Sequence, residues 1–424
     1  MAASETQAAI QAVFRIEWAR LVAGLARLTR DVGAAEELAQ DALVAALEHW
    51  PGSGLPDNPG AWLMATAKNA GLNRLRRDKL LARKRAEIAA DLDEEAGTDA
   101  RAAALEAALD DDVGDDVLRL MFTACHPALS TEAQVALTLR LLGGLSTDEI
   151  ARAFLTPEPT IAQRIVRAKR TLAEKKVPFE IPRGAELGPR LGSVLDVIYL
   201  IFNEGYAATA GQDLMRPALC DEALRLGRVL AELAPGEPEA PGLLALMELT
   251  AARAAAGTDA AGEPVLLLGQ NRALWDQLLL RRGLAALARA EALGRAPGPF
   301  GVQAAIAACH ARARTAGETD WAGIAALYAE LGALTPSPVV ALNRALAVAM
   351  AEGPQAGLDL LDAIAASPAL AGYHLLPSAR AELLARLGRR EEARAEFERA
   401  AALTRNTRQR DRLLERAAEL ARGA

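Results

Sequence analysis

The sequence predicts an all-α fold, and three observations support this prediction. Hydrophobic residues make up 51% of the 424 residues, but only 4% of the chain is aromatic. Alanine and leucine dominate the apolar content, and both favour helices. The chain shows no clean run of alternating Val, Ile and Thr of the kind that forms a strand. The length exceeds that of one compact core, so we expect two or three helical domains.

Composition also predicts a cytoplasmic protein that makes no use of a membrane, a metal or a cofactor. Cys125, Cys220 and Cys309 lie far apart and show no metal-ligand spacing, which gives neither a disulfide framework nor a zinc site. The N-terminus lacks the basic start and apolar run of a signal peptide. The most apolar stretch, residues 193–202, is short and is interrupted by Asp196.

The segment from Leu129 to Lys176 predicts three helices joined by two short turns. Thr131 and Gln134 can cap the first helix, which runs to the glycine pair at 143–144. Since Gly is the residue that most often ends a helix, this pair sets the first turn.

The next two helices of this segment have their own start signals. Ser146 with Glu149 forms a capping box for a second helix that ends near Phe154. Thr156 can cap the third helix, with Pro157 at its first position, where the missing N–H costs nothing.

The third helix has one apolar and one polar face. Its apolar stripe, which must face a core, is Ile161, Ile165, Ala168 and Leu172. Its opposite face carries Thr160, Gln163, Val166, Arg167 and Arg170, with Arg164 and Lys169 beside it. Residues 151–176 hold seven basic and two acidic side chains, although the whole chain has a net charge of -7. The pattern indicates a helix-turn-helix whose last helix enters a DNA major groove; the alternative is a three-helix packing unit with a solvated basic face.

Two helices are predicted near the N-terminus. The first covers residues 14–30, and Asp31 opens the second, which runs to about Trp50. No Lys or Arg lies between Asp31 and Glu48, so the carboxylates on this helix lack an i,i+4 partner. Either a basic partner surface relieves their repulsion or the face is simply solvated. The acidic side of the helix carries Glu36, Glu37, Gln40, Asp41 and Glu48.

The next segment predicts a loop followed by a basic helix. Three prolines and two glycines in residues 51–59 exclude regular structure there. The helix from Gly60 to about Arg85 begins with Trp62 and holds Asn69 and Asn73 one turn apart. Its cations are Lys68, Arg74, Arg76, Arg77, Lys79, Arg83, Lys84 and Arg85. Aromatic, amide and cationic side chains together suit a nucleic-acid backbone with exposed bases, and a merely solvated helix is the alternative.

Residues 86–116, which follow this basic helix, are strongly acidic. They contain twelve acidic residues and a single basic one, Arg101. Such a run predicts a flexible, solvated linker. It can also act as a decoy that occupies a cationic groove until nucleic acid displaces it.

Three segments in this order resemble the bacterial sigma-70 family of transcription initiation factors, of the extracytoplasmic-function type. DVGAAEELAQDALVAALEHW (31–50) is similar to regions 2.1 and 2.2, and NPGAWLMATAKNAGLNRLRR (58–77) to regions 2.3 and 2.4. The helix-turn-helix is similar to region 4. We therefore expect region 2 at 10–85, the linker at 86–116 and region 4 at 117–177, without room for a separate region 3.

The resemblance implies partners and binding residues. Core RNA polymerase would bind through its β′ clamp helices and β flap, and promoter DNA through two elements. The clamp would contact Asp31, Glu36, Glu37, Gln40 and Asp41. The melted minus-10 strand would contact Trp62, Lys68, Asn69, Asn73, Arg76 and Arg77. The minus-35 element would contact Thr160, Gln163, Arg164, Arg167 and Arg170. Ala162 and the PEP turn depart from the family pattern, so no promoter sequence is predicted.

Residues 183–424 form an extension beyond the Pro178–Pro182 hinge, divided by Pro- and Gly-containing breaks into helical hairpins. Near its end Gly388, Ala393, Phe397 and Ala400 fall where a tetratricopeptide-like helix pair places them, although the terminal proline of that repeat is missing. The whole chain resembles the sigma-factor subgroup with such an extension, which we expect to serve regulation or to bind a partner protein.

Two other functions are compatible with the sequence. One is a one-component helix-turn-helix transcription regulator with a helical sensor domain. The other is a helical enzyme or small-molecule sensor, which would need its polar residues to converge in a pocket. Those residues are Asn203, Glu204, Tyr206, His310, Asp320 and Trp321. We favour a sigma factor without catalysis of its own.

Overall fold

The computed structural model describes residues 3–71, 113–154, 156–206, 216–259, 265–404 and 407–422. Their regular elements are α-helices and short 3₁₀ helices, which confirms the all-α prediction. The chain divides into two compact units, Met1–Leu200 and Ile201–Ala424. Within the described ranges, no helix has both the length and the apolarity needed to cross a bilayer.

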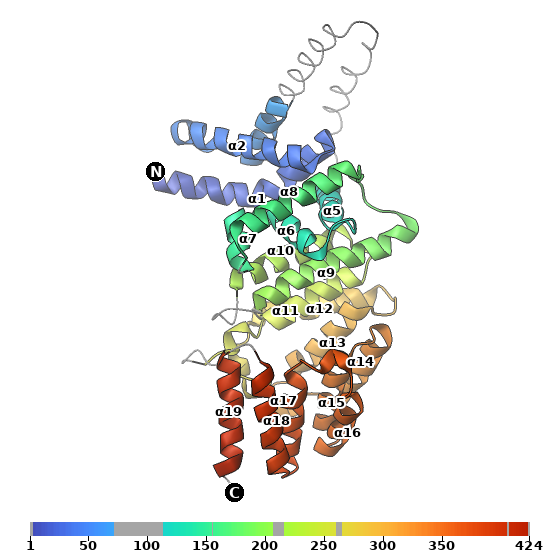
Figure 1. Ribbon diagram of the computed structural model, residues 1–424. Helices are drawn as coiled ribbons and strands as arrows, with labels where there is room; N and C mark the ends of the chain where they lie inside the picture. Colours follow the sequence, from blue (N-terminus) through green and yellow to red (C-terminus); the bar gives the residue numbers. More distant parts are fainter. Residues whose placement is uncertain are drawn as a thin grey trace. The chain divides into compact units, whose positions relative to one another are not determined.

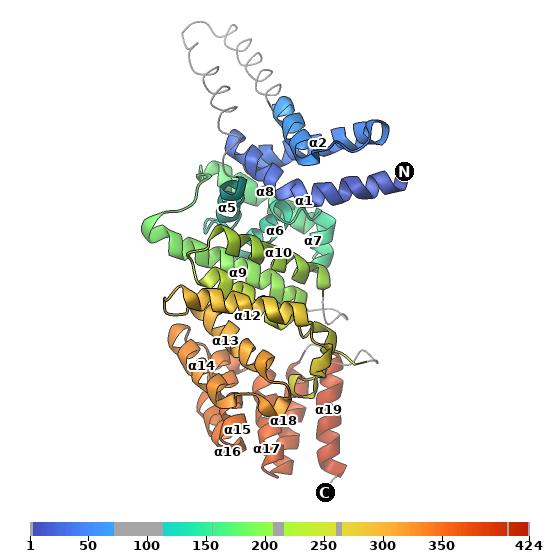
Figure 2. The ribbon, with the colours of Figure 1, turned by 180° about the vertical axis from the view of Figure 1, so that it is seen from behind.

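The first unit begins with two helices that pack side by side, α1 (Ala3–Thr29) and α2 (Val32–Ser53) (Figures 1 and 2). Asp31 caps α2, as predicted, because its Oδ1 accepts the N–H groups of Gly33 at 2.7 Å and Ala34 at 3.1 Å. Small residues on α2 allow this close approach. Ala35, Ala39, Ala42 and Ala46 are all buried.

The loop predicted at 51–59 is partly wrong, because α2 continues through Pro51 to Ser53. A proline in the last turn removes only one helical hydrogen bond. The N–H of Gly54, at φ 83°, donates to the Trp50 carbonyl at 2.9 Å and ends the helix. Residues 59–71 are helical again. The rest of the predicted basic helix and most of the acidic linker lie outside the described residues.

After the undescribed residues the unit continues with α5 (Val113–Ala124), α6 (Thr131–Leu141), α7 (Thr147–Ala153) and α8 (Glu158–Glu174). The capping box of Ser146 and Glu149 at the start of α7 is confirmed. Two predicted caps are wrong. Ser130, not Thr131, caps α6, and its Oγ accepts the N–H of Ala133 at 3.4 Å. Thr156 does not cap α8, since its hydroxyl donates to the Phe154 carbonyl at 3.2 Å.

The start of α8 needs little capping for a reason visible in the sequence. Pro157 and Pro159 both lack a backbone N–H, so fewer donors are left without a partner at this helix end. After α8, the segment containing Pro178 and Pro182 is non-helical and leads through the 3₁₀ helix η1 (Gly184–Glu186) to α9 (Leu187–Tyr206). The two compact units divide inside α9 rather than at that segment.

The second unit is a succession of helical hairpins (Figures 1 and 2). Among the described helices of this unit, four have proline as their first residue, the position where proline is best tolerated. The helices are α10 (Pro217–Leu233), α11 (Glu239–Ala251), α12 (Gln277–Ala292), α13 (Pro299–Arg312), α14 (Trp321–Leu334), α15 (Pro338–Ala351), α16 (Pro354–Ile364), α17 (Leu375–Arg386), α18 (Arg390–Leu403) and α19 (Thr407–Arg422). The 3₁₀ helices between them are η2 (Ala254–Ala256), η3 (Leu267–Gly269), η4 (Arg272–Leu274), η5 (Ala316–Glu318) and η6 (Pro368–Leu370).

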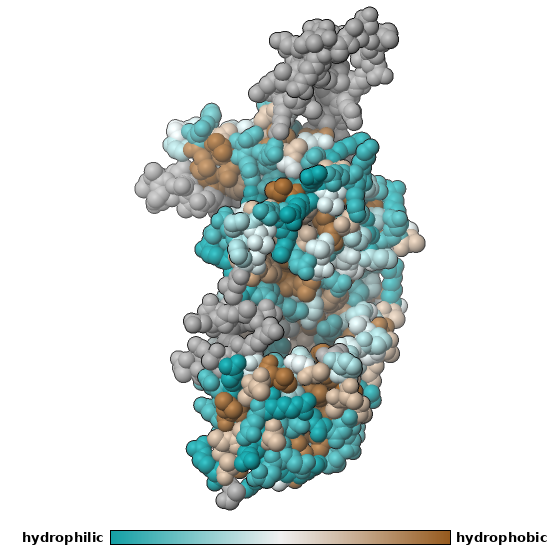
Figure 3. All heavy atoms as spheres, viewed as in Figure 1, coloured by the Kyte–Doolittle hydropathy of each residue, from teal (hydrophilic) through white to brown (hydrophobic). Residues whose placement is uncertain are grey.

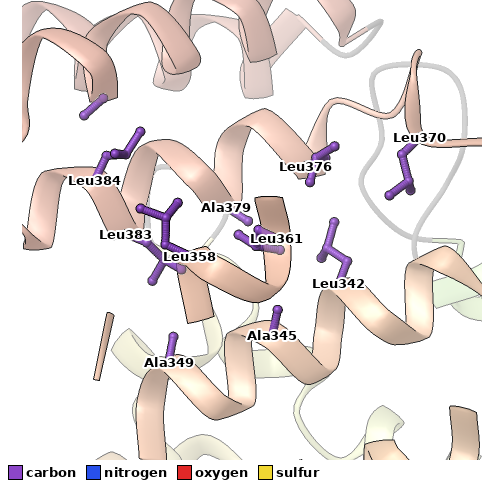
Figure 4. Packing of buried hydrophobic residues seen from close by; sticks show 11 residues of the cluster. Leu342, Ala345, Ala349, Leu358, Leu361, Leu370, Leu376, Ala379, Leu383 and Leu384 are labelled. Carbon is purple, nitrogen blue, oxygen red and sulfur yellow. The ribbon is translucent and has the colours of Figure 1, made fainter. Parts of the chain in front are cut away.

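Leucine and alanine form the core between α15, α16 and α17 (Figure 4). Leu342 and Leu361 come from neighbouring helices, and Leu383 from the third. At Gly357 a Cβ would lie 2.4 Å from the Cβ of Ala349, so the crossing of α15 and α16 requires a residue without a side chain. This close packing explains how a core with few aromatic residues is filled.

The predicted helix pair near the C-terminus is confirmed. Gly388 sits in the turn between α17 and α18 with φ 78°, a conformation that favours glycine. Ala393, Phe397 and Ala400 face inward from α18 and are buried.

Gly388→Ala should destabilise this helix pair by about 1 kcal/mol, because alanine is strained at positive φ. Gly372→Ala is the matched control: a Cβ at either position meets nothing within 4 Å, but only Gly388 has positive φ. Hydrogen exchange of α18 peptides measures the difference without assuming two-state unfolding. Equal protection in the two variants would contradict the role given to Gly388.

Candidate nucleic-acid interface

The two faces of α8 are separated as predicted. Ile161, Ile165, Ala168 and Leu172 are buried. The opposite side is exposed, and Val166 at its centre shows 63% of its surface. The exposed side chains are Thr160, Gln163, Val166, Arg167 and Arg170, while Arg164 and Lys169 are half-buried. The surface around α8 is largely hydrophilic in Figure 3.

A groove of about 370 Å³ runs along α8 and the N-terminal end of α6. It brings together four of the five predicted minus-35 residues: Thr160, Gln163, Arg164 and Arg167. Sequence reasoning missed two further polar lining residues, Ser130 and Thr171. Thr171 could have been found, since it lies three helical turns beyond Thr160. Ser130 could not, because its place depends on how α6 packs on α8.

The arginines of this face differ in their surroundings. Arg170 Nε donates to Glu174 Oε1 at 2.6 Å, with both side chains exposed. Within the described part of the chain, Arg167 has no such partner and lines the groove. The pKa of the Glu132 carboxyl, at the start of α6, is lowered by its own backbone N–H, by the Ser130 hydroxyl and by Arg164. Arg164 therefore lies near an acid, which leaves Arg167 best placed to meet an anion.

The acidic side of α2 is not uniformly solvated. Glu36 is buried, at 3% exposure, and its Oε1 accepts from Arg140 Nε at 2.6 Å. Lys169 forms an ion pair with Oε2 of the same carboxylate. Gln40 Nε2 donates to Glu36 Oε1 at 2.9 Å. Glu36 thus has no cationic partner on its own helix, as the sequence indicates, but α6 and α8 supply two partners from elsewhere in the chain.

Glu37 and Asp41, in contrast, lie on the exposed side of α2. Asp31 is exposed but its carboxylate is engaged in capping the helix. Five residues are assigned to polymerase binding. Glu37 and Asp41 are exposed, Asp31 caps the helix, Glu36 is buried, and half-buried Gln40 donates to Glu36.

The described minus-10 residues lie on the helical segment 59–71. Trp62 is half-buried and packs edge-on against Trp50, with ring centroids 5.3 Å apart. Lys68 is half-buried and Asn69 is exposed. The other three predicted residues, Asn73, Arg76 and Arg77, lie outside the described residues.

The polar residues considered for catalysis have structural partners. Glu204 is ion-paired with Arg216, and Tyr206 stacks on Phe202 with centroids 5.8 Å apart. Asp320 caps α14 by accepting the N–H of Gly323 at 2.8 Å. Asn203 is exposed.

His310 is buried near the end of α13, where its ring meets Trp321 edge-on at 5.2 Å. Burial lowers the pKa of His310 to about 4, and Arg253 and Arg272 contribute to the shift. The imidazole is therefore neutral at physiological pH. Arg272 donates to the His310 carbonyl at 2.7 Å and to Thr319 Oγ1 at 3.1 Å, which ties the end of α13 to the next segment.

The fold and α8 together define a class of protein: a helical factor that presents a helix-turn-helix to duplex DNA. Residues 16–80 match the family model of sigma-70 region 2, and residues 119–172 match that of sigma-70 region 4. Residues 190–291 match a family of unknown function, DUF6596. An uncharacterized protein of Rhizobium meliloti (strain 1021) is 44% identical over 384 residues, which cover 90% of this chain and 89% of the relative. The chain belongs to the sigma-70 family, which acts in promoter-specific transcription.

Arg167→Ala should weaken binding to a minus-35 duplex by about 1–3 kcal/mol if this side chain contacts base edges. Arg170→Ala should cost less, because Glu174 already engages that guanidinium. The measurement is a binding titration of the polymerase-bound protein against a duplex selected by the wild type from a random pool. Arg152→Ala is the control, since Arg152 lies on α7 and pairs with Asp148. Arg167→Ala binding as tightly as this control would contradict the assignment.

Proposed function

We propose that this chain binds core RNA polymerase, recognises two promoter elements and helps to separate the DNA strands, without catalysis of its own. The observation that carries the proposal is the presence of sigma-70 regions 2 and 4 in one chain, with region 4 presenting the polar face of α8 outward. An extracytoplasmic-function type of factor fits the short distance between the two regions.

In this proposal the exposed carboxylates of Glu37 and Asp41 meet a basic surface of the polymerase β′ clamp, and region 4 meets the β flap. Trp62, Lys68 and Asn69 face the melted minus-10 strand together with Asn73, Arg76 and Arg77. The groove along α8 holds the minus-35 duplex through Thr160, Gln163, Arg164, Arg167 and Arg170. Exposed carboxylates of this kind mainly set the rate and specificity of association.

Charge reversal at Glu37 and Asp41 tests the proposal. Glu37→Lys with Asp41→Lys should weaken binding to purified core polymerase by about tenfold or more, since like charges would then face each other. Asp57→Lys is a control for added positive charge, because this exposed residue lies off the α2 surface. Affinity is measured by titrating labelled protein with core enzyme. Wild-type affinity of the double variant would show that α2 does not dock through these residues.

We further propose that the second unit is a regulatory or partner-binding module. Its support is architectural: stacked helical hairpins such as α15 to α18 commonly form extended surfaces for protein partners. Its hairpins also resemble tetratricopeptide repeats at Gly388, Ala393 and Phe397.

A chain that ends after Tyr206 tests the regulatory role. It keeps α9, whose Arg190 donates to the Phe122 carbonyl at 2.8 Å and anchors α9 on α5. Transcription by core polymerase with this shortened chain should differ from that with the full chain on the same promoter template. Equal RNA output from both chains at matched occupancy would refute the role.

A further inference from the structure

The second unit brings two arginines, a tryptophan and a histidine together from three segments of the chain. Arg253 lies between α11 and η2, Arg272 and Trp275 lie in and just after η4, and His310 lies on α13. We call these four residues the Arg253 cluster. They lie outside the residues that match sigma-70 regions 2 and 4.

A backbone hydrogen bond holds the first two segments together. The Asp276 N–H donates to the Ala252 carbonyl at 2.9 Å. Arg253 and Trp275 are the chain neighbours of these two residues, so they flank a direct backbone contact. The helices η2 and η4, next to them, are also in contact.

Arg272 joins the third segment to the other two. Its Nη1 donates to the His310 carbonyl at 2.7 Å, and its Nη2 donates to Thr319 Oγ1 at 3.1 Å. The guanidinium carbon lies 4.9 Å from the centroid of the Trp275 ring. The cluster is therefore a fixed arrangement within one compact unit.

The positive charges of the cluster are not neutralised by an ion pair. The acceptors of Arg272 are two carbonyls and a hydroxyl, all of them uncharged. Among the residues that the structure describes, no carboxylate pairs with Arg253 or Arg272. Burial lowers the pKa of Arg272; Glu318 opposes this shift and Arg253 adds to it. The two arginines are thus close enough to repel each other.

Two buried polar atoms lie in the same cluster. Trp275 is 3% exposed and His310 is 8% exposed. Within the described ranges, neither Trp275 Nε1 nor His310 Nδ1 has a hydrogen-bond partner. Buried polar atoms without a partner are uncommon, because their desolvation is not compensated. A neutral imidazole carries one proton, which Nδ1 can hold, so both atoms can act as donors.

The chemistry of these groups selects the ligand. Two cations and two uncharged N–H donors, without an intervening carboxylate, favour an anion that accepts several hydrogen bonds. The donors come from three segments of the chain and therefore approach from different directions. A phosphate group has oxygens at the corners of a tetrahedron and can accept from all of them, whereas the two oxygens of a carboxylate lie in one plane.

We propose that the Arg253 cluster binds the phosphate group of a small molecule. Arg253 is the main charged contact, and the indole of Trp275 and the imidazole of His310 donate hydrogen bonds. Arg272 holds the segments together and adds positive potential. The ligand is either inorganic phosphate or a phosphomonoester. This binding site is independent of polymerase and promoter binding, and it would make the second unit a sensor of a small molecule.

The experiment follows the indole N–H signals of the full-length protein by NMR after ¹⁵N labelling of its five tryptophans. The signal of Trp275 is assigned by its loss in Trp275→Phe. Sodium phosphate is titrated against sodium chloride at constant ionic strength. The Trp275 signal should shift and reach saturation, whereas the signal of Trp18, in the first unit, should stay in place.

Arg253→Gln should weaken phosphate binding about tenfold or more, because it removes a charge-assisted contact. Arg253→Lys should recover part of the affinity, since it keeps the charge but not the paired donors of a guanidinium. Arg281→Gln is the matched control, because it removes an exposed arginine from α12 in the same unit. Wild-type positions of the other indole signals verify that each variant is folded.

Two further probes define the ligand. Glycerol 3-phosphate that binds more tightly than inorganic phosphate would identify a phosphomonoester, and the reverse order would identify inorganic phosphate. Sodium acetate that binds as tightly as phosphate would contradict the choice of a phosphate group. The proposal is overturned if neither phosphate probe moves the Trp275 signal, or if Arg253→Gln gives the wild-type titration.

Discussion

The proposed DNA-binding surface of this protein depends on the burial of one apolar stripe, Ile161, Ile165, Ala168 and Leu172. A helix with a single apolar stripe can be buried in only one rotational setting, so its opposite face must point outward. On α8 that outward face holds the arginines, Gln163 and Thr160. The packing of α8 against α6 and α7 therefore stabilises the module, and its contact with α6 also forms the groove that we propose for DNA.

The charged residues are distributed unevenly along the chain. The chain is acidic overall, with a net charge of -7, yet residues 151–176 are basic. A basic segment such as this one attracts phosphate, and so does the basic segment after Trp62, whereas acidic segments repel it. The buried Glu36 adds a second use of charge, since its ion pairs with Arg140 and Lys169 join α2 to α6 and α8.

Features set by neighbouring residues were predictable from the sequence. The capping box of Ser146 and Glu149 and the cap at Asp31 involve residues within three positions of each other. The stripe on α8 follows from the helical repeat alone. Prediction fails where two local signals compete. Ser130 and Thr131 are both good caps, and only the structure shows that Ser130 is the one used. Proline usually ends a helix, but the final turn of α2 tolerates Pro51. The partners of Glu36 could not be predicted, because Arg140 and Lys169 are more than 100 residues away.

Our proposal that this chain directs core RNA polymerase to promoters is best tested by transcription. Purified core polymerase is supplied with a genomic template, with and without the full-length protein, and the RNA 5′ ends are mapped. New start sites, present only with the protein, should share two sequence elements upstream. A set of start sites identical to that of core enzyme alone would contradict it.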